Sequence, residues 1–180
     1  LGLGPYVTLT ADPVPIANTV ADLELCDDFI DGDSTNGIVQ SFDLESQTSG
    51  ILGSQDPTNY TVTYHISQND ATNNADPLSS PFTNTVANQQ TIYVRVTGNG
   101  CYFDRYNFNV IVNPLPIANF VADLEICDDD SDGSARNGFS QSIDLETQTA
   151  TILGAQDPSV YSVTYHNSLA EAQAGTIPLV

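Results

Sequence analysis

The sequence contains no lysine, methionine or tryptophan, and its basic residues are three arginines, Arg95, Arg105 and Arg136. Against 23 acidic residues, these three give a formal net charge of -20 at pH 7. A nucleic-acid-binding protein needs a basic surface to displace the counterions of the phosphates, so we expect no nucleic-acid partner. Adsorption to an anionic membrane through a polybasic patch is excluded for the same reason.

The missing lysine also excludes Schiff-base chemistry, a P-loop lysine and a Lys–Asn isopeptide crosslink. No apolar run approaches the roughly 20 residues of a membrane helix, so we expect no direct membrane insertion. Charged residues make up 14% of the chain, and the apolar fraction is 40%, with many Val, Ile, Tyr and Phe. This composition indicates a folded, acidic, β-rich chain and not a disordered one.

An internal repeat dominates the sequence. PIANTVADLELCDD begins at Pro15 and PIANFVADLEICDD begins at Pro116, an offset of 101 residues that continues without a gap to the end. This self-similarity indicates a tandem duplication. We expect the chain to be a segment of a longer array of repeats. It would comprise the last strand of a preceding repeat (1–13), a complete repeat (14–114) and a partial second repeat (115–180).

Within the repeat, apolar and polar residues alternate with the period of a β-strand. Asn-Gly pairs indicate tight turns, and segments 45–53 and 67–74 are candidates for short helical turns. Repeats of about 101 residues with roughly seven short strands predict an all-β fold of tandem immunoglobulin-like or fibronectin-like β-sandwiches. The residues predicted to be buried are Tyr60, Val62, Tyr64, Val94, Val96, Phe108 and Val110. Those predicted to be exposed are Thr63, His65, Arg95 and Asn109.

An acidic loop follows the first cysteine of each copy. In the second copy, Asp128, Asp130, Asp132 and Gly133 have the opening spacing of a calcium loop, in which alternate carboxylates converge on one ion. The match is partial, because Phe139 stands where an EF-hand has its bidentate glutamate. The alternative is a solvated acidic turn built on Asp-Gly and Asn-Gly. The candidate calcium ligands are Asp128, Asp130, Asp132, Asn137 and Asp144, with Asp27, Asp28, Asp31, Asp33, Asn36 and Asp43 in the first copy.

The three cysteines are explained by the repeat. Cys26 and Cys127 occupy the same position in successive copies, whereas Cys101 lies late in the complete repeat. A disulfide within one repeat joins Cys26 to Cys101. The alternatives are a Cys101–Cys127 bridge across the linker, or free buried thiols. A disulfide predicts an oxidising, extracellular environment, and without a CxxC motif or a Cys–His cluster we expect no zinc site.

Two short patterns predict glycosylation, and no pattern predicts catalysis. Asn59 begins an N-x-T sequon, and Ser34 lies in an Asp-Ser-Thr segment that resembles an O-glycosylation site of exported Bacteroidota proteins. The equivalent His65 and His166 have no nucleophile motif beside them. A glycosidase needs two carboxylates in a cleft, which a small repeated sandwich rarely offers. We therefore predict that the chain is not an enzyme.

Several motifs together resemble a known family. The chain is similar to the tandem repeats of giant cell-surface adhesins of Bacteroidota. The motifs that carry this similarity are LE(L/I)CDD, DLE, QDP, VTYH, QTIYVRVTGNGCY and NPLPIAN. These adhesins are exported by the type IX secretion system and include SprB-like gliding-motility adhesins. The resemblance spans essentially the whole chain. It implies attachment and extension from the cell, with no catalytic residues.

These observations predict a structural spacer segment of an extracellular adhesin or filament, supporting adhesion and gliding motility. The expected location is the cell surface, with association to the outer membrane through other parts of the protein. The expected partners are neighbouring repeats, together with surface polysaccharide or other surface proteins, and calcium is the expected cofactor. The alternative is a glycan- or protein-binding module of an exported surface protein.

Overall fold

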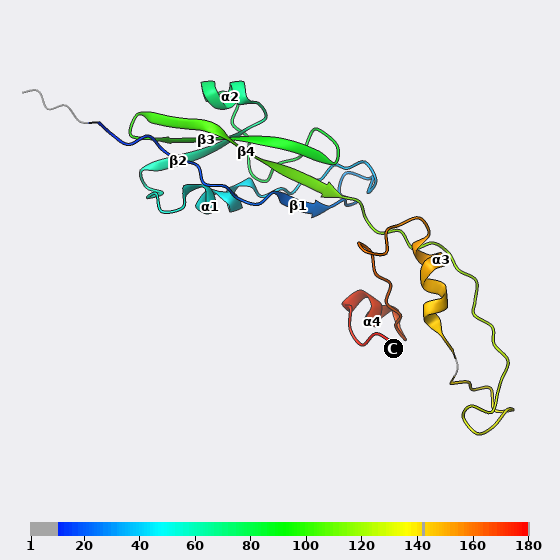
Figure 1. Cartoon of the computed structure of the whole chain (residues 1–180). Coiled ribbons are helices and arrows are strands. Elements are labelled where there is room, and N and C mark those ends of the chain that lie inside the picture. The colour runs from blue at the N-terminus through cyan, green and yellow to red at the C-terminus, as the bar shows by residue number, and fades with distance from the viewer. Residues whose placement is uncertain (1–10, 142, 180) are drawn as a thin grey trace, which may run out of the picture. The chain divides into compact units, whose positions relative to one another are not determined.

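The computed structural model describes residues 11–141 and 143–179 (Figure 1). The chain divides into two compact units, Leu1–Leu115 and Pro116–Val180, which are described separately. Most of the segment 1–13, expected to be a strand of a preceding repeat, lies outside the described residues. No described helix is long and apolar enough to cross a membrane.

Unit 1 is built on one mixed, curled sheet of four strands. The strands are β1 (Leu23–Cys26), β2 (Tyr60–His65), β3 (Gln89–Gly98) and β4 (Cys101–Asn113), in the spatial order β1-β4-β3-β2. The pairs β2–β3 and β3–β4 are antiparallel, whereas β1 is parallel to β4. The first described strand of the unit therefore lies beside its last strand, and β2 forms the far edge (Figure 1).

The turn between β3 and β4 is the predicted Asn-Gly turn. Asn99 and Gly100 lie between the paired residues Gly98 and Cys101 and have φ values of 53° and 79°. Two successive left-handed residues are the requirement of a type I′ hairpin, which Asn-Gly satisfies with the least strain. This turn, called the hairpin end below, is opposite the end where β4 leads into residues 114–116, called the linker end.

Short helical segments form where local capping signals stand. η1 (Leu44–Gln47) continues into α1 (Thr48–Leu52), and α2 (Gln68–Asn73) follows β2. The Asp43 side chain accepts a hydrogen bond from the amide of Ser46, and the Ser67 side chain accepts one from the amide of Asp70. These N-caps satisfy amides that a helix start leaves without partners. The predicted helical turns at 45–53 and 67–74 are confirmed.

One face of the sheet carries the hydrophobic core. Ile92, Val94 and Val96 are fully buried at alternate positions of β3, as the period-2 pattern predicts. Facing them are residues of η1 and α1 and of the preceding loop. The core comprises Val39, Phe42, Leu44, Ile51, Leu52, Tyr64, Phe82, Ile92, Val94, Val96, Phe108, Val110 and Val112.

The fold is strand-based, as predicted, but a two-sheet sandwich is not established. Among the described residues, strand pairing outside the sheet is limited to one bridge between Phe42 and Phe82. The segment from residue 36 to 59, where a sandwich would place strands of its second sheet, forms turns and the η1–α1 segment. The Asp43 cap explains this difference in part, because it starts a helical turn where a strand would have to continue.

The opposite face of the sheet is also covered, which the sequence did not indicate. His65 and Arg95 were predicted to be exposed, and both are buried, with exposed fractions of 0% and 9%. The reason is α2, which packs on this face (Figure 1), together with the residues that follow it. Arg95 donates to carbonyls of α2, and His65 Nδ1 lies 2.8 Å from the carbonyl oxygen of Ala75. Tyr64, Val94, Val96, Phe108 and Val110 are buried as predicted, whereas Tyr60 and Val62 are only half-buried.

Arg95 acts as a cap for the last turn of α2. Its Nη1 atom donates to the carbonyl oxygens of Ala71 (2.9 Å) and Thr72 (2.8 Å), and its guanidinium lies 3.7 Å from the ring centroid of Tyr102. Cations favour the carbonyl end of a helix, and a stacked aromatic ring adds a cation–π contribution. Arg95 therefore ties α2 to the sheet.

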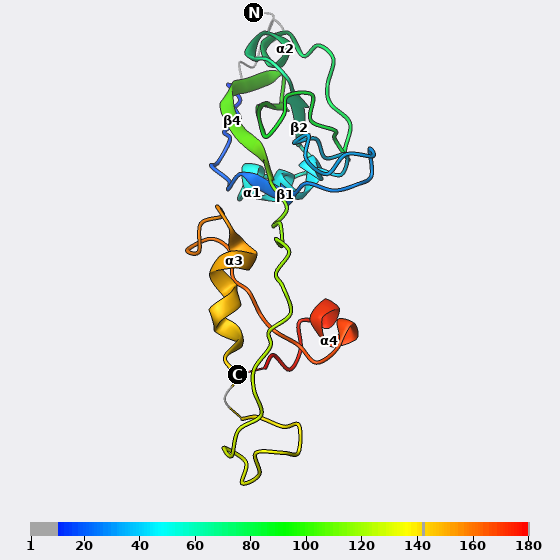
Figure 2. The ribbon, with the colours of Figure 1, turned by 90° about the vertical axis from the view of Figure 1, so that its right-hand side faces the viewer.

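Unit 2 repeats the helical segments but contains no strand among its described residues. η2 (Leu145–Gln148), α3 (Thr149–Leu153) and α4 (Leu169–Ala174) correspond to η1, α1 and α2 (Figure 2). Residues 161–166 correspond to β2, yet they are not a strand. Among the described residues of unit 2, no segment pairs with 161–166 as β3 pairs with β2 in unit 1, so these residues lack ladder hydrogen bonds.

The contacts of Arg95 predict a large effect of its removal. In Arg95→Met, the carbonyls of Ala71 and Thr72 lose a charged donor, so we expect the free energy of unfolding to fall by about 2–3 kcal/mol. The matched control is Arg105→Met at an exposed position of β4, where we expect a change within about 0.5 kcal/mol. Urea unfolding of the 180-residue chain measures both, and equal losses would contradict the capping role.

Candidate functional site

The structure separates the two cysteines that were predicted to form a disulfide. Cys26 is the last residue of β1 and pairs with Asn113 at the end of β4, whereas Cys101 is the first residue of β4. Twelve residue steps of extended strand span about 40 Å. A disulfide requires Cα atoms about 4.4–6.8 Å apart. The predicted Cys26–Cys101 bridge is therefore wrong for this fold.

The cause of this error is the parallel pairing of β1 with β4. Cys26 lies at the linker end of unit 1, and Cys101 lies at the hairpin end. All three cysteines are free thiols: Cys26 and Cys127 are exposed, and Cys101 is half-buried. The complete repeat thus carries an exposed thiol, Cys26, at the linker end and a half-buried thiol, Cys101, at the hairpin end.

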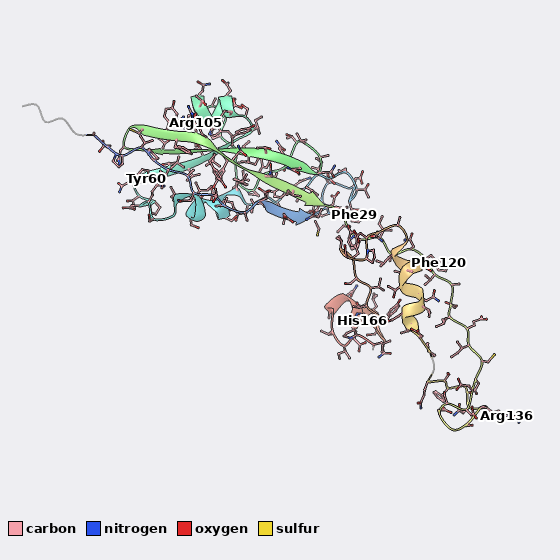
Figure 3. The ribbon with its side chains drawn as sticks, in the orientation of Figure 1. Phe29, Tyr60, Arg105, Phe120, Arg136 and His166 are labelled. Carbon is pink, nitrogen blue, oxygen red and sulfur yellow. The ribbon has the colours of Figure 1, made fainter. Side chains whose placement is uncertain are left out.

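The acidic loop of the first copy also lies at the linker end, where Figure 3 shows Phe29. Asp27 is buried, with 3% of its surface exposed, and its carboxylate accepts hydrogen bonds from the amides of Asp28 (2.9 Å) and Gly37 (2.8 Å). Gly37 has a φ of 71°, and a Cβ atom there would stand 2.5 Å from the Asn88 side chain. Glycine is therefore required at position 37, where the loop passes close to Asn88.

The other carboxylates of this loop bind backbone amides of the loop itself. Asp31 accepts from the Asp33 amide (3.0 Å) and from the side-chain amide of Asn36 (2.7 Å). The hydrogen bond from Asn36 is the main cause that lowers the pKa of Asp31 below its usual value. Asp28 and Asp33 accept from the amides of Ile30 and Thr35 in the same manner. These contacts are Asx turns, the alternative that the sequence left open.

The second copy repeats the pattern. Asp128 accepts from the Gly138 amide (2.8 Å), and Asp132 accepts from the amide of Ser134 (3.0 Å) and from the side chain of Asn137 (2.8 Å). Asp43 and Asp144 stand apart from the loops as the N-caps of η1 and η2. Among the described residues, no three His, Cys, Asp or Glu side chains are grouped so that they could hold a metal ion. Calcium binding stays a prediction.

The predicted glycosylation positions lie at the surface or close to it. Asn59 is exposed in the turn before β2, where its side-chain amide donates to Asp56 (3.1 Å). Ser34 is half-buried in the acidic loop. Both assignments remain predictions.

A groove along β2 is a feature that the sequence reasoning missed. It has a volume of about 600 Å³, and five consecutive residues of the edge strand, 60–64, contribute to its lining. The remaining lining comes from η1, α1, Pro57 and residues 77–80. The available signal was the repeat itself: Glu45, Leu52 and Pro57 have identical counterparts in Glu146, Leu153 and Pro158.

The chain matches the family described as the Flavobacterium inter-domain disulphide bond domain, over residues 22–116 and again over 123–180. These segments include most of the sequence, so the chain belongs to this family. The match agrees with the coarser part of the predicted resemblance, to domains of Bacteroidota surface proteins. No curated protein and no solved structure matches the chain.

The two interpretations of the acidic loop predict different melting behaviour. A calcium site at residues 128–144 would raise the stability of the 180-residue chain by about 2.7 kcal/mol when free calcium exceeds the Kd a hundredfold. A turn held only by its own amides predicts the same melting temperature in calcium and in chelator. Differential scanning calorimetry in both buffers distinguishes the two interpretations. In the double variant Asp130→Ala/Asp132→Ala, any effect of calcium on the melting temperature should disappear.

Proposed function

We propose that the chain is a load-bearing spacer of an extracellular Bacteroidota adhesin of the gliding-motility type. The observation that carries this proposal is the parallel pairing of β1, the first strand of the unit, with β4, its last. Leu23 pairs with Val110, and Cys26 pairs with Asn113. Tension on the two chain ends therefore pulls these strands past each other along their length. Their hydrogen bonds are loaded together and not one after another.

The cysteines support a second element of the same proposal, a covalent link between repeats. Cys26 lies at the linker end, beyond which the next repeat begins, and Cys101 lies at the hairpin end. In an array of complete repeats, we propose that Cys26 forms a disulfide with the cysteine of the following repeat that corresponds to Cys101. The family description, which names an inter-domain disulphide, supports a link of this kind.

The chemistry of this link is ordinary thiol–disulfide exchange. Two thiols form one S–S bond and lose two protons and two electrons, which reduce the disulfide of an oxidoreductase in the export pathway to a dithiol. The link would resist separation of neighbouring repeats under tension. It also requires an oxidising environment, in agreement with a cell-surface location.

Other parts of the proposal rest on the sequence. Neighbouring repeats are the first partners, and the charge of -20 keeps identical repeats from pairing edge to edge. The immunoglobulin-like or fibronectin-like sandwich class remains a proposal, supported by the bridge between the core residues Phe42 and Phe82. The binding-module alternative, for glycan or protein, is favoured by the groove along β2.

The shear arrangement predicts which strand determines mechanical strength. Leu25→Pro removes an amide from β1, whereas the control Thr61→Pro removes one from the edge strand β2. We expect Leu25→Pro to lower the unfolding force far more than the control does, even where the two lower equilibrium stability similarly. Single-molecule pulling from the two chain termini measures the force, and equal forces for both variants would contradict the proposed load path.

The proposed link between repeats predicts the products of oxidation. When the 180-residue chain is oxidised, peptide mapping should find no Cys26–Cys101 link in the monomer. Links from Cys101 of one copy to Cys26 or Cys127 of another should appear in dimers, because they join opposite ends of two repeats. The Cys101→Ser variant should lose these head-to-tail links. A monomer containing a Cys26–Cys101 peptide would refute the assignment.

A further inference from the structure

The free edge of β2 lies within the groove described above. β2 is the last strand of the sheet, so only one of its two edges is paired with β3. The groove follows the other edge, and residues of η1, α1 and the segment 77–80 also line it. An edge strand beside a groove is a site where an extended peptide can add as a further strand.

The backbone of β2 shows which groups such a peptide would meet. The carbonyl of Tyr64 accepts a hydrogen bond from the amide of Leu78 (2.8 Å), and the amide of Tyr60 donates to the carbonyl of Asp56 (3.2 Å). Both groups therefore point away from β3. Because backbone groups alternate along a strand, the amide and carbonyl of Val62 point the same way. Among the described residues, none bonds to the Val62 backbone on that side.

The side chains of the groove combine apolar surface with negative charge. Leu52, Pro57 and Leu78 provide apolar surface. The Tyr64 hydroxyl is hydrogen-bonded to Thr48 (2.8 Å), and burial raises the pKa of Tyr64 to about 12, so this side chain is neutral. The charged residue in the lining is Glu45.

A further carboxylate borders the groove. Asp43 accepts a hydrogen bond from Ser80, which is one of the lining residues (3.0 Å). Neither Arg95, which is buried under α2, nor Arg105 contributes to the lining. The groove of unit 1 therefore combines apolar side chains with threonine and serine hydroxyls along its length, and it is acidic at one side.

Unit 2 forms part of this groove, although its described residues contain no strand. A groove of about 620 Å³ is lined there by Glu146, Leu153, Pro158, Tyr161 and Val163, among others. The flanking hydrogen bonds recur as well: Leu179 donates to Tyr165 (2.8 Å), and Tyr161 donates to Asp157 (3.0 Å). Unit 2 thus keeps part of the lining and the two backbone contacts on either side of the central valine. The counterparts of Thr63, Tyr64, Pro77 and Leu78 line a separate pocket there.

We propose that the β2 groove binds an extended peptide strand of another protein, with alternating apolar and basic side chains. The peptide pairs with the Val62 amide and carbonyl, places its apolar side chains against Leu52 and Leu78, and its basic side chains near Glu45. A second copy of this chain is a poor occupant, because each copy carries a net charge of -20. This inference is independent of the spacer proposal.

The test uses the ¹⁵N-labelled 180-residue chain and three synthetic peptides. The first alternates arginine and valine over five residues, the second is the same peptide N-methylated on its backbone, and the third has glutamate in place of arginine. Titrations followed at the Val62 and Tyr64 amides by NMR give a site-specific Kd. We expect the first peptide to shift these amides and the N-methylated peptide to bind at least about fivefold more weakly.

Matched variants test the charge. Glu45→Gln should weaken binding of the arginine peptide about threefold, because it removes a partly exposed ion pair. Glu125→Gln makes the same change of net charge at an exposed position outside both grooves and should leave the Kd unchanged. The glutamate peptide should bind more weakly than the arginine peptide.

Several results would overturn the proposal. Peptide-induced shifts elsewhere, with the Val62 and Tyr64 amides unmoved, would place the binding site outside the groove. Equal binding of the N-methylated peptide would refute strand addition, and equal binding of the glutamate peptide would refute a basic partner. If the chemical shift of the Val62 amide changes with protein concentration in the absence of peptide, and the protein diffuses more slowly, the occupant of the groove is a second copy of the chain and not a foreign peptide.

Discussion

The hydrogen bonding of β4 to both of its neighbours is the interaction on which the rest of unit 1 depends. β4 pairs with β1 on one side and with β3 on the other, and β2 joins through β3. The buried side chains of β3 and β4 then form the floor on which η1 and α1 pack. Unit 2 shows the converse: residues 163–166 have the same sequence as residues 62–65, Val-Thr-Tyr-His, but only the latter form a strand. A strand requires a neighbour, because its backbone groups have no partners within the strand itself.

Features that depend on local hydrogen bonds were predictable from the sequence, and they recur in both units. Asp43 and Asp144 cap equivalent helical turns, although they were predicted as candidate calcium ligands and not as caps. Asp31 and Asp132 close equivalent loops through Asn36 and Asn137. The Asn-Gly hairpin and the buried face of β3 were predictable for the same reason, since turn chemistry and side-chain alternation are read over a few residues. None of these features requires knowledge of which strands are neighbours.

Features that depend on contacts between distant segments were not predictable. Alternation places Arg95 and His65 on the face opposite the core, but it does not reveal that α2 covers that face. The disulfide assignment failed because chain order does not show that β1 runs parallel to β4, with Cys26 beside Asn113. The groove along β2 likewise exists only because residues 77–80 and α1 come to lie at one edge of the sheet. In each case the missing information is the position of a second element.

The scarcity of basic residues connects these features. Arg95 is one of three arginines, and its guanidinium is occupied by the carbonyls of α2 and the ring of Tyr102. It therefore offers little positive charge to the carboxylates at the surface. Repeats of this composition repel one another, which protects the open edge of β2 from pairing with its own copies. The same repulsion does not act on a basic strand. In a neutral repeat, an open edge strand would promote aggregation. In an acidic repeat, the negative charge that prevents self-association also favours binding of a positively charged partner strand.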